Sequence, residues 1–86
     1  MIIEHEEKWL EMIDTSVEIA SNDELFAGGY LRGHISLSAA DCEAEGIEDV
    51  ESFKKKVEQS LEDARSELTP ADRTIVADLW AQLTKA

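Results

Sequence analysis

The side chains best suited to chemistry lie between residues 28 and 42, where the sequence reads GGYLRGHISLSAADC. Cys42 and His34 are the thiol and the base that a nucleophilic pair would need. On one continuous helix, however, their spacing of eight residues places them about 12 Å apart along the axis and about 80° apart around it. We therefore predict no catalytic residue and expect that the chain is not an enzyme. Cys42 is expected to pack as a small hydrophobic residue.

The glycines of this stretch match a phosphate-binding loop only in part. Gly28 and Gly33 are separated by four residues, but His34 and Ile35 stand where such a loop needs lysine and then serine or threonine. The glycine spacing of a dinucleotide-binding turn is also missing. We therefore predict no cofactor. Arg32 leaves one alternative, an anion or small-molecule site, whose candidate residues are Gly29, Tyr30, Arg32, Gly33 and His34.

The spacing of the histidines argues against a metal site. Helical bundles that hold two metal ions use Glu-x-x-His on two helices, whereas Ile2 stands three residues before His5 and Leu31 three before His34. Structural zinc needs clustered cysteine and histidine, and this chain has a single cysteine. We therefore predict that the protein binds no metal.

The charge of the chain limits its partners. Its 86 residues include 20 Asp and Glu against 8 Lys and Arg, a net charge of −12. Such a surface repels phosphate groups, so we predict no direct binding to nucleic acid and no binding to membranes. No apolar run approaches the about 20 residues of a membrane span, and the acidic N-terminal segment lacks the features of a secretory signal. We expect a cytoplasmic protein.

Hydrophobic periodicity predicts four helices and no strand, within a single domain over residues 1–86. The first helix carries an apolar stripe over residues 2–20, and the third carries one over residues 50–68. Because the connections are short, we predict an all-α, up-and-down four-helix bundle.

Capping residues mark where the other helices begin and end. Ser21 and Glu24 form a capping box, which starts the second helix. Gly46 is suited to end that helix in a left-handed conformation. Thr69 and Pro70 fit the N-cap and first position of the fourth helix.

The second helix, residues 23–44, has two apolar faces. One comprises Phe26, Tyr30, Gly33, Leu37 and Ala40; the other comprises Leu31, Ile35 and Cys42. We predict a central helix that is buried on both faces, with Gly29 and Gly33 letting a neighbouring helix backbone approach closely. Alternatively, one of the two faces meets a partner. Gly28 can mark a bend or a break, and the pattern leaves open whether the helix is continuous through Gly28 and Gly29.

Two blocks of the sequence resemble a known family. The segments DELFAGGYLRGHISLSAADCE and SLEDARSELTPADRTIVADLW look like the YfcL family of small bacterial proteins, and GYLRGH, residues 29–34, is the most specific part. The resemblance implies a compact helical domain of the bacterial cytoplasm. It supplies no active-site residue, because the family has no assigned activity.

These observations favour a non-enzymatic binding or adaptor protein. Its expected partner is a protein with a basic surface, or a second copy of the chain that docks through the candidate interface residues Leu31, Ile35 and Cys42. The alternative is the small-molecule or anion site around Arg32. Mimicry of nucleic acid by an acidic helical surface is a further hypothesis that follows from charge alone.

Overall fold

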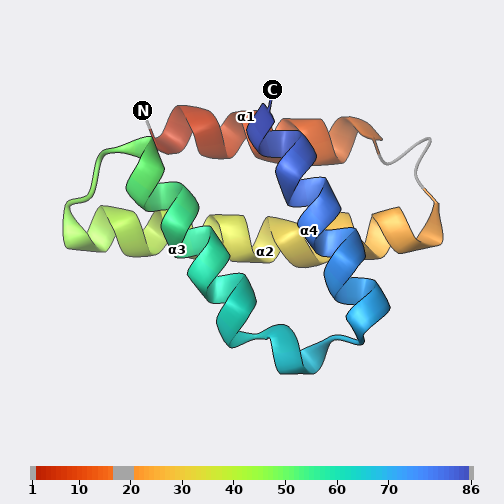
Figure 1. The fold of residues 1–86 in the computed structure, drawn as a ribbon. Helices are drawn as coiled ribbons and strands as arrows, with labels where there is room; N and C mark the ends of the chain where they lie inside the picture. The colour runs from red at the N-terminus through yellow and green to blue at the C-terminus, as the bar shows by residue number, and fades with distance from the viewer. Residues whose placement is uncertain (1, 17–20, 86) are drawn as a thin grey trace.

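The fold is all-α, as the periodicity predicts. The computed structural model describes residues 2–16 and 21–85, and those residues contain no β-strand. The elements, in chain order, are α1 (Ile2–Ser16), α2 (Asn22–Glu45), α3 (Val50–Asp63), the 3₁₀ helix η1 (Arg65–Glu67) and α4 (Pro70–Lys85) (Figure 1).

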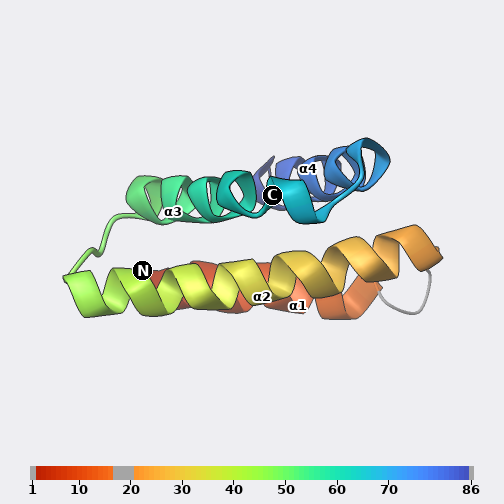
Figure 2. The same ribbon diagram turned by 90° about the horizontal axis from the view of Figure 1, so that it is seen from below.

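The four helices form two layers. Figure 2 shows α1 and α2 side by side in one layer and α3 and α4 in the other. In Figure 1 the second pair crosses the first steeply, and η1 joins the ends of α3 and α4 beyond the edge of α2. An up-and-down bundle needs four axes that are nearly parallel or antiparallel. The predicted up-and-down arrangement is therefore not confirmed; two crossed helix pairs take its place.

The capping signals in the sequence are confirmed. Ser21 and Glu24 form a reciprocal capping box at the start of α2, and Gly46 ends that helix at a φ of 72°. The Asp49 side chain accepts from the backbone N–H of Ser52 and caps α3. The α4 N-terminus is capped by the Thr69 hydroxyl. These side chains bind backbone groups that the helix ends leave without partners.

The third helix is shorter than its apolar stripe predicts. α3 ends at Asp63, and the chain continues through η1 to Leu68, which is extended at φ −115° and ψ 149°. An isolated turn of 3₁₀ helix changes the direction of the chain, so that it can reach the start of α4 at Pro70. Leu68 therefore packs from a connecting segment, not from a helix.

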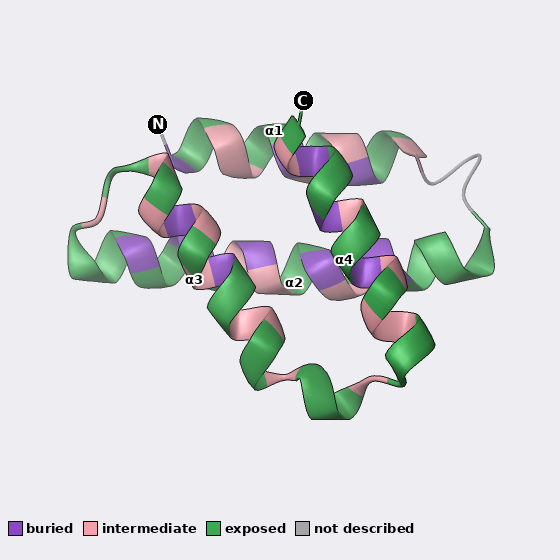
Figure 3. Ribbon diagram, in the orientation of Figure 1, coloured by how far each residue is buried: buried purple, intermediate pink, exposed green. Residues whose placement is uncertain are grey.

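An aromatic cluster joins the two layers. Trp9 of α1, 2% exposed, lies with its ring centroid 5.2 Å from that of Phe53 in α3 and 5.0 Å from that of Trp80 in α4. Figure 3 shows the buried positions of the helices gathered where the layers meet. From the predicted stripe of α1, Ile2 and Ile13 are also buried, while positions 17 and 20 lie outside the described residues.

Only one of the two predicted faces of α2 is buried. Leu31, Ile35 and Cys42 are each 0% exposed and belong to the core, whereas Phe26 is 43% and Leu37 57% exposed. α2 packs against α1 within its own layer and against α3 and α4 of the other layer, and the face with Leu31, Ile35 and Cys42 is the one they cover. The prediction of a helix buried on two faces is therefore wrong.

The close helix approach occurs at Gly28, not at the two glycines predicted for it. A Cβ added at Gly28 would lie 3.0 Å from Cγ2 of Ile13 in α1, whereas a Cβ at Gly29 or Gly33 would have no neighbour within 4 Å. Gly28 thus provides space for α1, and α2 continues through it without a break. Gly29 and Gly33 have no packing role within the described chain.

Replacing either of these two glycines with alanine is expected to stabilise the protein. Both positions are exposed within a long helix, where glycine costs about 0.5 to 1 kcal/mol relative to alanine. We expect Gly29→Ala and Gly33→Ala each to raise the free energy of unfolding by about that amount, measured by urea denaturation. A loss of stability in either variant would show that a neighbour does contact that position.

Candidate binding surface

The exposed face of α2 carries an uncharged, largely apolar stripe. We call it the α2 outer face and define it by Phe26, Tyr30, Gly33, Leu37 and Ala40. Their spacings of four, three, four and three residues form the seam that one helix presents to another in a coiled coil. The stripe is about 21 Å long at 1.5 Å per residue. Because large exposed apolar stripes are uncommon on soluble proteins, this face is the leading candidate for a binding surface.

Aromatic rings contact one another at one end of the outer face. The Phe26 and Tyr30 rings stack with centroids 5.9 Å apart, and the Tyr30 and His34 rings lie 4.6 Å apart. The Tyr30 hydroxyl is buried and has no hydrogen-bond partner among the described residues. Burial of this hydroxyl, with a smaller contribution from the charge of Glu67, raises the pKa of Tyr30. Tyr30 is thus the half-buried member of the stripe, whereas Phe26 and Leu37 are exposed.

His34 joins this face to the second layer. Its Nδ1 lies 2.6 Å from the Ser60 hydroxyl of α3, and either atom can donate in that hydrogen bond, according to the imidazole tautomer. Burial lowers the pKa of His34 below its usual 6.5, although the Glu67 carboxylate opposes the shift. The neutral imidazole is thus the form that the fold favours.

Folding stability is expected to fall in mild acid because of His34. A histidine whose pKa is lowered in the folded state binds its proton more readily when unfolded, so its contribution is present above the unfolded pKa of 6.5 and is lost as the pH falls through the folded value. We expect a lower free energy of unfolding at about pH 5 than at about pH 7.5, and a smaller decrease in His34→Gln. An equal decrease in both proteins would exclude His34 as the cause.

The acidic residues of α2 lie at the two ends of the outer face. From Leu25 to Ala40 the only Asp, Glu, Lys or Arg is Arg32. Acidic residues stand at both ends of α2, Asp23 and Glu24 at the start and Asp41, Glu43 and Glu45 at the end. An uncharged stripe between two acidic ends complements a partner that is apolar in the middle and basic toward its ends.

The residues of the predicted anion site do not come together. Arg32 makes a two-pronged contact with Asp14 of α1, Nε to Oδ1 at 3.2 Å and Nη2 to Oδ2 at 3.1 Å. That contact lowers the pKa of the Asp14 carboxyl. Tyr30 and His34 lie toward α3 and η1 instead, while Gly29 and Gly33 are open. Arg32 is therefore already paired with a carboxylate of the neighbouring helix.

The predicted interface residues lie in the core. Leu31, Ile35 and Cys42 are fully buried by the other helices, so a second copy cannot dock on them without unfolding the domain. Burial raises the pKa of the Cys42 thiol, which makes it a poor nucleophile. The prediction that these residues form an interface with a second copy is therefore wrong, because the sequence pattern is similarly apolar on both faces of α2 and does not show which face the other helices cover.

Neither a metal cluster nor a membrane-spanning helix is found within residues 2–16 and 21–85. No three His, Cys, Asp or Glu side chains there are grouped closely enough to hold a metal ion. The helices described are too short or too polar to cross a bilayer.

Comparison with known proteins identifies relatives of the whole chain. The family model described as YfcL protein matches residues 3–85. A protein named "Uncharacterized protein YfcL" from Escherichia coli (strain K12) is 45% identical over 85 residues, which cover 96% of this chain and 92% of that protein. No solved structure gives a significant match. Because the family model spans nearly every position, the chain belongs to the YfcL family.

Proposed function

We propose that this protein is a non-enzymatic binding protein of the bacterial cytoplasm, which docks an amphipathic, basic helix of a partner protein on the α2 outer face. The observation that carries the proposal is that one uncharged stripe contains both glycine that no neighbouring side chain covers and large apolar side chains that are exposed. Gly33 lies between Phe26 and Leu37, and nothing in the described chain covers it.

The glycines support a close-packed partner. Two exposed glycines within α2 cost the isolated domain about 1 to 2 kcal/mol together, and no contact within the described chain compensates for this. Small residues along one helix let a second helix backbone approach closely. A docking helix would make use of the space above Gly29 and Gly33 and would cover Phe26 and Leu37.

The charges favour a basic partner over a second copy. If two α2 helices packed through their outer faces, acidic ends would meet acidic ends in both the parallel and the antiparallel orientation, because both ends of α2 are acidic. The net charge of −12 adds long-range repulsion between copies. A helix with lysine or arginine toward its ends would gain attraction from the same carboxylates, and the attraction would weaken with added salt.

The test uses a probe peptide of about 18 residues, long enough to cover the stripe, with leucines spaced three and four apart and lysines near both ends. We expect it to bind the wild-type protein, and Leu37→Glu to weaken that binding by about tenfold or more. Ile3→Glu is the matched control, because Ile3 is 59% and Leu37 57% exposed. A scrambled peptide of equal charge should bind far more weakly than the probe.

A second variant separates binding from stability. The Gly29→Ala, Gly33→Ala double variant is expected to be more stable than the wild type, yet to bind the probe peptide several-fold more weakly, because the added methyl groups hold the two helices apart. Unchanged peptide affinity in this variant, or equal losses in Leu37→Glu and Ile3→Glu, would refute docking on the outer face.

A further inference from the structure

A groove lies between α3 and α4, apart from the α2 outer face. The two helices run side by side, and η1 closes the space at one end (Figure 1). The groove has a volume of about 290 Å³, at the lower end of the range for small-ligand sites. Its apolar lining comprises Leu61, Leu68, Val76 and Trp80.

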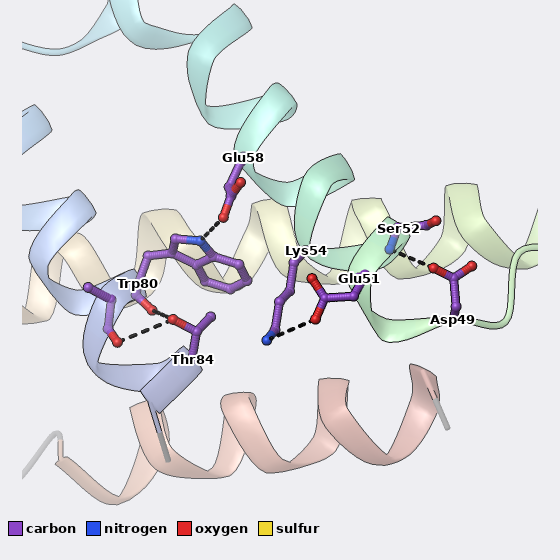
Figure 4. Close-up of polar contacts among 8 residues, drawn as sticks. Asp49, Glu51, Ser52, Lys54, Glu58, Trp80 and Thr84 are labelled. Carbon is purple, nitrogen blue, oxygen red and sulfur yellow. Dashed lines mark hydrogen bonds and ion pairs between the residues drawn. The ribbon is translucent and has the colours of Figure 1, made fainter.

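Trp80 spans the gap between the two helices and forms part of the groove wall. Its indole Nε1 donates to Oε2 of Glu58 at 3.1 Å (Figure 4), and the residue is 7% exposed. The hydrogen bond satisfies the one polar atom of the indole and fixes its orientation. The indole thus forms a buried part of the groove wall, and its polar group is already bonded.

Three of the four charged side chains that line the groove have partners of their own. Glu58 accepts from Trp80, and Glu62 pairs with Arg65 at 3.0 Å. Arg73 differs, since its one hydrogen bond among the described residues runs from Nε to the Leu68 carbonyl at 3.4 Å, and it forms no ion pair there.

This arginine is unusual in so acidic a chain. Arg73 is half-buried and has no carboxylate partner within residues 2–16 and 21–85, although the chain has 20 Asp and Glu. The guanidinium presents a planar fork of donors that matches a carboxylate, and its two Nη groups are not used by the described residues. A cationic donor set beside an apolar wall complements an anion with an apolar body.

We propose that the groove between α3 and α4 binds a small monocarboxylate with an apolar body. The carboxylate accepts hydrogen bonds from Arg73, and the apolar body packs on Leu61 and Leu68, the half-buried part of the apolar lining, beside the edge of Trp80. This site is independent of the α2 outer face, so each can fail without the other.

Phenylacetate is a suitable probe, followed by NMR through the assigned indole N–H of Trp80. We expect the resonance to shift with a Kd on the order of 1 mM, as for other ligands of this size. Phenylacetamide has the same ring but no charge, and acetate has the charge but no ring. Each should bind about tenfold more weakly or worse if Arg73 and the apolar wall both contribute.

Two variants of equal charge change complete the test. Arg73→Gln should weaken phenylacetate binding by about tenfold, whereas Lys55→Gln, at an exposed position of α3 that does not line the groove, should leave it unchanged. The comparison of phenylacetate with phenylacetamide on the wild-type protein needs no variant, so it stands even if Arg73→Gln unfolds. Equal binding of these two compounds, no shift at Trp80, or full affinity in a folded Arg73→Gln would overturn the proposal.

Discussion

Trp9→Ala is expected to lower the free energy of unfolding by about 3 to 5 kcal/mol, because it removes the ring that joins the two helix layers. Trp9 is 2% exposed, and its ring contacts both Phe53 and Trp80. Domains of this size often have a total stability of only about 5 kcal/mol or somewhat more. We therefore expect a large fraction of Trp9→Ala to be unfolded at 37 °C, as measured by urea denaturation followed by circular dichroism.

Phe26→Ala serves as the matched control for Trp9→Ala. It also removes an aromatic ring, but Phe26 is 43% exposed and its ring contact is with Tyr30 on the same helix. We expect a loss of less than about 1 kcal/mol. If Phe26→Ala were the more damaging of the two, the aromatic cluster would not be the centre of the core.

Ile35→Ala is expected to cost about 2 to 5 kcal/mol, and Leu37→Ala less than about 0.5 kcal/mol. The two residues are two positions apart on α2, but Ile35 is 0% exposed and Leu37 is 57% exposed. Removing a buried side chain leaves a cavity that the surrounding helices fill only in part, whereas the Leu37 side chain already lies in water. The difference in unfolding free energy between the two variants is the measurement.

The same pair tests which face of α2 is buried. A large loss in Leu37→Ala as well as in Ile35→Ala would mean that the outer face is covered too, either because α2 is buried on two faces or because the protein self-associates through that face. Equilibrium sedimentation of both variants distinguishes these two outcomes, because only self-association changes the measured mass.

The helix ends that carry capping residues were predictable, because each depends on a few adjacent residues; the end of α3 at Asp63 was not. Ser21 and Glu24 bond within one turn, and Gly46 adopts the left-handed conformation that suits glycine. Thr69 likewise caps α4 by accepting a hydrogen bond from the backbone N–H of Asp72, three residues later. Local chemistry of this kind does not depend on how the helices pack, so the sequence pattern was sufficient.

The orientation of α2 was not predictable, because it depends on which helices lie beside it. Leu31 and Leu37 are equally apolar, and nothing in the sequence indicates that the neighbouring helices cover Leu31 and leave Leu37 exposed. Gly28, Gly29 and Gly33 illustrate the same limit, since only the structure shows that Ile13 approaches Gly28. The crossing of the two layers was likewise not predictable, because crossing angles depend on how side chains of neighbouring helices interlock.

The sequence did not point to Arg73 as a candidate binding residue, for a related reason. Arg73 lies in a segment where acidic and basic residues balance, so its charge alone gave no signal. Its significance comes from the absence of an ion pair among the described residues and from the apolar wall beside it. One weak signal was available, because Arg73 and Trp80 are seven residues apart and thus lie on the same side of a helix.

The most direct test of docking on the α2 outer face is a backbone amide NMR titration of the wild-type protein with the basic amphipathic peptide. We predict that the largest shifts fall on residues 26 to 40 of α2, at Phe26, Tyr30, Gly33, Leu37 and Ala40. Shifts concentrated on α3 and α4, or none at saturating peptide, would contradict the account.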